Sequence, residues 1–136
     1  DGQLSTLAKV AKKWTGGQPI LTHYFFGQAE QVLLQDPNIG CIDAFDEAGA
    51  FVRDHKPAFV NSWHEQLNAI MEQEPEIRAL LRAYAADITK DTNPKARADF
   101  STPDVNLFLA GWVGKNHEGR WGIRSECHQE WAREIL

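Results

Sequence analysis

Residues 57–88 read PAFVNSWHEQLNAIMEQEPEIRALLRAYAADI, and each proline in this stretch is followed by apolar residues at helical spacing. Proline suits the first turn of a helix, because the amide hydrogen that it lacks would have no partner there, and it disfavours helix at the preceding residue. We therefore expect each proline to end one helix and to begin the next. The apolar positions expected to face inward are Val60, Trp63, Leu67, Ile70 and Met71, then Ile77, Leu80, Leu81, Tyr84 and Ile88.

The N-terminal part of the chain repeats this pattern. A basic amphipathic segment is expected to form the first helix and to end at Gly16 and Gly17, because glycine adopts the backbone conformation that closes many helices. Pro19 opens a wide apolar stripe, which predicts a central helix. Pro37 opens a further amphipathic helix, with Asp36 as its expected N-cap. Short corners between helices of similar length favour antiparallel neighbours.

The C-terminal part allows two interpretations. Residues 101–104 resemble a helix start, and Gly114 would be the C-cap of that helix. The alternative is a β-hairpin with arms at 107–113 and 120–125. We favour the helix, because the first arm lacks strict alternation of apolar and polar residues. Ser125 is then the expected N-cap of a last amphipathic helix.

Length and composition set the fold class. A chain of 136 residues has room for one core, and no stretch approaches the roughly 18 uninterrupted apolar residues of a membrane span. We predict an all-α, single-domain antiparallel bundle-like array of six or seven helices over residues 1–136, with a C-terminal β-hairpin at 107–125 as the minor alternative. The polar segment that contains Pro94 is expected to be an exposed connection.

Charge and cysteine content exclude several classes of function. The net charge of −5 argues against binding of duplex nucleic acid by bulk charge, since neutralising phosphates needs a basic face. Cys41 and Cys127 are too far apart for a zinc-finger spacing. Neither a Glu-x-x-His pair nor a complete zinc-protease motif occurs, because Asn68 stands where the second histidine of that motif belongs. No metal or cofactor is expected.

The first residue is Asp1, so we expect a processed or excised product from which any targeting peptide is missing. The sequence leaves the compartment open, and a cytoplasmic location is the default expectation. It does not specify an oligomeric state.

The segment 114–124, GKNHEGRWGIR, has the most unusual composition in the chain. Guanidinium groups and aromatic faces suit anions, planar rings and partner surfaces, and tryptophan and arginine are enriched at binding hot spots. We predict a binding or regulatory module that recognises a partner protein or a small ligand through this loop. The alternative for Trp121 is that it packs on the core while the loop charges are solvated. The predicted binding residues are Trp112, Lys115, His117, Arg120, Trp121 and Arg124.

Two other functions remain open from the sequence. Cys127 lies at the start of the last predicted helix, where the helix dipole would lower its pKa, so a small thiol enzyme would need a histidine brought close by folding. We favour a buried structural cysteine over this alternative. A bundle that sequesters a planar or apolar ligand is the second alternative, although ordinary core packing explains the same side chains. Its candidate pocket residues are His23, Tyr24, Phe25, Trp63 and Tyr84.

Overall fold

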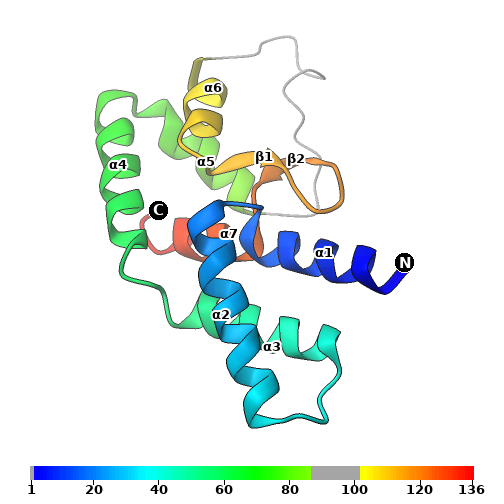
Figure 1. Ribbon diagram of the computed structural model, residues 1–136. Coiled ribbons are helices and arrows are strands. Elements are labelled where there is room, and N and C mark those ends of the chain that lie inside the picture. Colours follow the sequence, from blue (N-terminus) through cyan, green and yellow to red (C-terminus); the bar gives the residue numbers. More distant parts are fainter. Residues whose placement is uncertain (1, 87–101) are drawn as a thin grey trace.

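Seven helices and one two-stranded sheet form the part of the chain that the computed structural model describes, residues 2–86 and 102–136 (Figure 1). The predicted all-α array is therefore confirmed, while Ile88 and Pro94 lie outside the described residues. None of the described helices is long and apolar enough to cross a membrane. The elements in chain order are α1 (Gly2–Thr15), α2 (Pro19–Gln35), α3 (Cys41–Asp54), α4 (Val60–Gln73), α5 (Glu76–Ala86), α6 (Thr102–Leu109), β1 (Val113–Lys115), β2 (Trp121–Ile123) and α7 (Glu126–Arg133).

Among the described prolines before residue 87, those at 19, 57 and 75 stand at or just before helix starts, and Pro37 does not. Pro19 is the first residue of α2, and Pro57 and Pro75 precede α4 and α5 by a turn or less. Pro37 does not open α3, which begins at Cys41. Asp36 is the C-cap of α2 rather than the N-cap of α3, since its backbone N–H donates to the Val32 carbonyl.

Helix α7 occupies the centre of the molecule, among α1, α3 and α5 (Figure 1). Its Trp131 is fully buried, and the indole N–H donates to the carbonyl of Arg53 at the end of α3, at 3.1 Å. From the opposite side of the helix, the side-chain amide of Gln129 donates to the Ala85 carbonyl of α5 at 2.9 Å. The last helix in the sequence thus joins helices that are far from it along the chain.

Helices α1 and α3 approach closely at a glycine. The Trp14 ring lies against Gly49, and a Cβ atom at this position would overlap the indole. The indole N–H of Trp14 donates to Oδ1 of Asp46 at 2.9 Å. Asp46 lies about one turn before Gly49 on α3, so this hydrogen bond fixes the orientation of the ring. Gly49 is therefore required by packing, because any side chain there would displace Trp14.

Helix α6 ends earlier than expected, and the hairpin follows it. Gly111 has φ +87°, and the Trp112 N–H donates to the Leu107 carbonyl while the Gly111 N–H donates to Phe108, which is a Schellman motif. The predicted helix through Trp112 with Gly114 as C-cap is therefore wrong. Strands β1 and β2 pair antiparallel, with Val113 opposite Ile123 and Lys115 opposite Trp121.

Candidate functional site

A cavity of about 270 Å³ opens where the start of α2, the middle of α4, the α6–β1 connection and the start of α7 meet. We call it the inner cavity. Side chains from elements far apart in the sequence converge on it. Those that define its chemistry are Gln18, Trp63, Gln66, Trp112, Arg124 and His128.

His128 is held in one orientation by Ser125, the N-cap of α7. The Ser125 hydroxyl oxygen accepts the backbone N–H of His128 at 3.2 Å and lies 2.6 Å from Nδ1 of the same residue. Both side chains are buried, so the one hydroxyl proton finds its acceptor at Nδ1. The ring proton is thereby assigned to Nε2.

His128 lines the inner cavity. No described residue forms a hydrogen bond with its Nε2 atom. Every solvent-inaccessible side-chain nitrogen of the described residues has a hydrogen-bond partner, so we infer that Nε2 is accessible from the cavity. Burial, together with the nearby positive charge of Arg124, lowers the pKa of His128 to about 3. The imidazole is therefore neutral at physiological pH and offers an N–H donor to the cavity.

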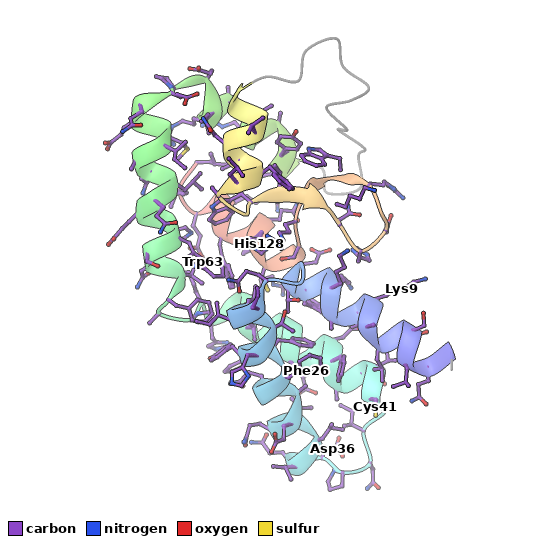
Figure 2. The ribbon with its side chains drawn as sticks, turned by 45° about the horizontal axis from the view of Figure 1, so that its top comes forward. Lys9, Phe26, Asp36, Cys41, Trp63 and His128 are labelled. Carbon is purple, nitrogen blue, oxygen red and sulfur yellow. The ribbon has the colours of Figure 1, made fainter. Side chains whose placement is uncertain are left out.

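Indole rings form two walls of the inner cavity. The Trp63 ring is parallel to the His128 ring, with planes 6° apart and centroids separated by 5.9 Å, and the two side chains lie side by side in Figure 2. Trp112 meets His128 edge to face at 5.5 Å and is itself stacked on His64 at 5.9 Å. These contacts fix the orientation of both indole rings, and Trp112 is almost fully buried while Trp63 is half-buried at the cavity.

Arg124 supplies the positive charge of the inner cavity. Its Nε donates to the Gly16 carbonyl at 2.9 Å, and a Cβ on Gly16 would come within 2.5 Å of the arginine side chain, so the end of α1 holds the side chain in place. The guanidinium also lies against Gly111, where a Cβ would be 3.5 Å from Nη1. No described aspartate or glutamate pairs with this half-buried cation. Its Nη atoms therefore keep donors for an incoming group.

The other predicted loop residues do not reach the inner cavity. Arg120 and His117 both lie beside the Glu118 carboxylate at the hairpin tip, and Lys115 is exposed on β1. The half-buried Trp121 stacks on Phe108, with centroids 5.4 Å apart, and its indole N–H donates to the Tyr84 hydroxyl at 3.0 Å. Of the six predicted binding residues, the fold brings Trp112 and Arg124 together.

Cys127 has the wrong surroundings for a nucleophile. Its thiol is buried and donates to the Gly49 carbonyl, at 4.0 Å. Burial raises the pKa of this thiol to about 12, so the expectation of a pKa lowered by the helix dipole is wrong. The neighbouring His128 directs its Nδ1 to Ser125 instead.

The five predicted pocket residues do not gather around one cavity. His23 is exposed, Phe25 is fully buried against Phe45, and Tyr84 is buried beneath the hairpin. Tyr24 packs edge to face on Phe59. Trp63 does line a cavity, but with residues of the C-terminal segment.

Sequence reasoning missed His128 and Ser125 as site residues. A Ser-x-x-His spacing at a helix start was the available signal, because an N-cap side chain and the residue three positions later face each other. No group of three or more histidine, cysteine, aspartate or glutamate residues suited to a metal ion occurs among residues 2–86 and 102–136. Comparison with protein-family models, with curated proteins and with solved structures finds no match to this chain.

Proposed function

We propose that this protein is a ligand-binding module whose inner cavity takes up the anionic group of a flat, apolar compound. The observation that carries the proposal is the half-buried guanidinium of Arg124, which no described carboxylate neutralises. Removing a cation from water is costly unless a partner compensates it. A carboxylate placed between Arg124 and the Nε2–H of His128 would receive charge-assisted hydrogen bonds from both.

The walls of the cavity support the flat apolar part of this proposal. Trp63 is half-buried at the cavity and its stacking on His128 fixes its orientation, while the buried Trp112 closes the cavity behind His128 and His64. Aromatic faces stack favourably on planar groups and lose little conformational entropy on binding. The volume, about 270 Å³, lies near the lower end of the range for small-molecule sites, so a single ring with one acidic group is the expected occupant.

This proposal keeps the predicted binding module but moves its centre from the hairpin tip to the base of the hairpin. The raised pKa of Cys127 speaks against a thiol enzyme, and the separation of His23, Phe25 and Tyr84 speaks against a cavity inside the bundle. Recognition of a partner protein by Arg120 at the hairpin tip remains a prediction.

Benzoate and its neutral counterpart benzamide test the proposal. Titration of ¹⁵N-labelled protein, followed by the indole N–H signal of Trp112 and the Nε–H signal of Arg124, should give a dissociation constant at least fivefold lower for benzoate. The preference arises because only the carboxylate carries a charge for the guanidinium to neutralise. The comparison needs no substitution, so it does not depend on whether a variant folds.

Two substitutions test whether Arg124 is the positive charge that binds the carboxylate. Arg124→Gln should abolish the preference for benzoate, and the matched control Lys115→Gln, which removes an exposed cation outside the inner cavity, should preserve it. The ¹H–¹⁵N spectrum of each variant reports whether it is folded. Equal affinities of the wild-type protein for the two probes, or shifts confined to the hairpin tip, would overturn the proposal.

A further inference from the structure

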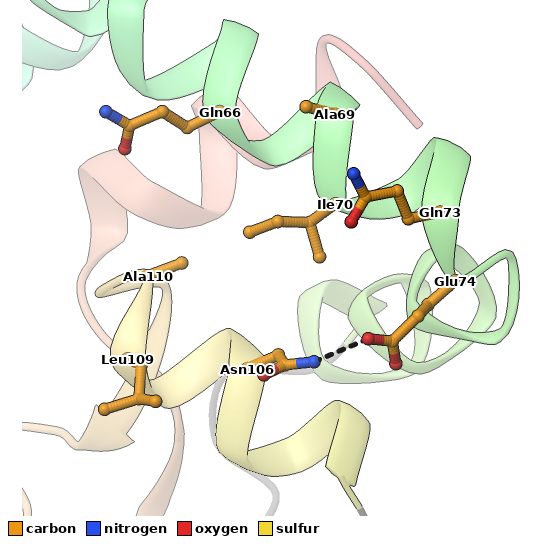
Figure 3. Close-up of a pocket in the computed structure, with 8 residues that line it drawn as sticks. All are labelled: Gln66, Ala69, Ile70, Gln73, Glu74, Asn106, Leu109 and Ala110. Carbon is orange, nitrogen blue, oxygen red and sulfur yellow. Dashed lines mark hydrogen bonds between the residues drawn. The ribbon is translucent and has the colours of Figure 1, made fainter.

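A second, larger depression runs beside the inner cavity, between α4 and α6. It has a volume of about 640 Å³, and Figure 3 shows α4 residues on one side and Asn106, Leu109 and Ala110 on the other. We call it the outer groove. Gln66, Leu109 and Ala110 line both the outer groove and the inner cavity, so the two form one continuous surface.

The floor and rim of the outer groove have complementary chemistry. Ile70 and Ala69 of α4 and Leu109 of α6 are apolar, and Leu109 is largely exposed. Gln66 and Gln73 stand one above the other along α4, and no described residue hydrogen-bonds to their side-chain amides. A side-chain amide offers both a donor and an acceptor, which matches the alternating N–H and C=O groups of an extended peptide.

The two ends of this surface carry opposite charges. Arg124 lies in the inner cavity, and Glu74 closes the far end of the outer groove. One carboxylate oxygen of Glu74 accepts the Asn106 side-chain N–H at 2.8 Å (Figure 3), and no described lysine or arginine pairs with this residue. An occupant that complements both ends has an anionic group at one end and a cationic group at the other.

We propose that the ligand is the C-terminal segment of a peptide, with its terminal carboxylate between Arg124 and His128 and a lysine or arginine side chain at Glu74. This inference rests on the proposed function, because it assigns the same inner cavity to the carboxylate. A C-terminal aromatic side chain lies against Trp63, and the preceding residues follow the outer groove.

The length of the groove sets the spacing of the two charges. Gln66 and Glu74 are separated along α4 by about 12 Å at a rise of about 1.5 Å per residue. An extended peptide advances about 3.3 Å per residue. The carboxylate lies beyond Gln66 in the inner cavity, so the basic side chain belongs at least four residues before the C-terminus, and acetyl-Lys-Ala-Ala-Ala-Phe with a free carboxylate is the shortest matching probe.

Calorimetric titration of the full chain with this peptide should give a dissociation constant at least tenfold lower than that of benzoate. The same peptide with a C-terminal amide should bind at least tenfold more weakly than the free acid. Replacing its lysine by glutamate should also weaken binding.

A charge exchange tests the outer end of the groove. Glu74→Lys should lower the affinity for the lysine peptide at least fivefold and raise the affinity for the glutamate peptide by a similar factor. The affinity for benzoate should stay unchanged. Glu72→Lys is the matched control, because Glu72 is exposed on α4 and does not line the groove, so the lysine peptide should bind this variant like wild type. Recovery with the exchanged peptide also shows that the variant is folded.

The outcomes separate the two proposals. If benzoate binds but the peptide acid binds no more tightly than benzoate, or if the peptide amide binds as well as the acid, the peptide assignment is wrong while the inner cavity retains its anion site. If Glu74→Lys leaves the affinities of both peptides unchanged, the outer groove is not the path of the peptide. If neither benzoate nor the peptide binds, both proposals fail.

Discussion

The protonation state of His128 depends on its surroundings in the folded protein. Burial and the charge of Arg124 hold its pKa near 3, against 6.5 for an ordinary histidine. Between these values the unfolded chain binds a proton that the folded ring does not take up. Because the unfolded state binds more protons, stability is full above about pH 6.5 and is lost as the pH falls toward 3.

We therefore predict that His128 contributes a slope of about 1.4 kcal/mol per pH unit to the free energy of unfolding within that interval. Urea unfolding between pH 4 and pH 7.5 measures it. The pKa of His64 is also lowered by burial, so the slope of the wild-type protein contains contributions from both histidines. The difference in slope between the wild type and His128→Asn gives the contribution of His128. Identical slopes for the two proteins would contradict the buried, neutral state of His128.

The site residues were only partly predictable at this scale. Composition drew attention to Trp112 and Arg124 in one set and to Trp63 in another, but nothing in the sequence joins the two sets, because their contact depends on how α4 packs against the C-terminal segment. Residue chemistry left Cys127 open as a nucleophile beside the favoured buried structural cysteine, and its burial agrees with the structural interpretation. Residue type suggests what a side chain can do, and the fold decides which side chains meet.

At the scale of elements, substitutions at two glycines test the contact between α1 and α3. Gly49→Ala should lower the free energy of unfolding by about 1–3 kcal/mol, because a methyl group there overlaps the Trp14 ring. The matched control is Gly27→Ala in α2, where a Cβ meets nothing within 4 Å and alanine favours the helix by roughly 0.5–1 kcal/mol. Thermal unfolding of both variants checks the pair. Similar changes in both would mean that helix propensity, not the Trp14 contact, governs Gly49.

Helix boundaries followed from the sequence where a proline and an apolar stripe agreed. Pro19, Pro57 and Pro75 mark corners as expected. Pro37 misled because proline is permitted in the first turn of a helix but is equally suited to a turn, and here Gly40 caps α3 instead. The hairpin was the less favoured alternative for residues 107–125, because each strand has only three residues, too few for an alternation to appear.

At the scale of the whole molecule, the centre of the fold is made by the segment that is last in the described chain. Cys127, Trp131 and Ala132 of α7 are fully buried, and this helix contacts α1, α3 and α5, which are distant from it in sequence. Helical patterning predicts that such a segment is amphipathic, but it does not predict which helix the others surround. The arrangement makes cooperativity depend on contacts that are distant in sequence.

A chain that ends at Ser125 should therefore lose cooperative unfolding. Deleting one fully buried tryptophan costs about 3–5 kcal/mol, and the deletion also removes the other buried side chains of α7, which together rival the roughly 5–15 kcal/mol that stabilises a typical domain. Thermal unfolding followed by far-ultraviolet circular dichroism measures the effect. The control removes residues 1–9, none of which is described as buried, and should keep a single transition at a lower midpoint. A sharp transition in the chain that lacks α7 would place the centre of the fold among the other helices instead.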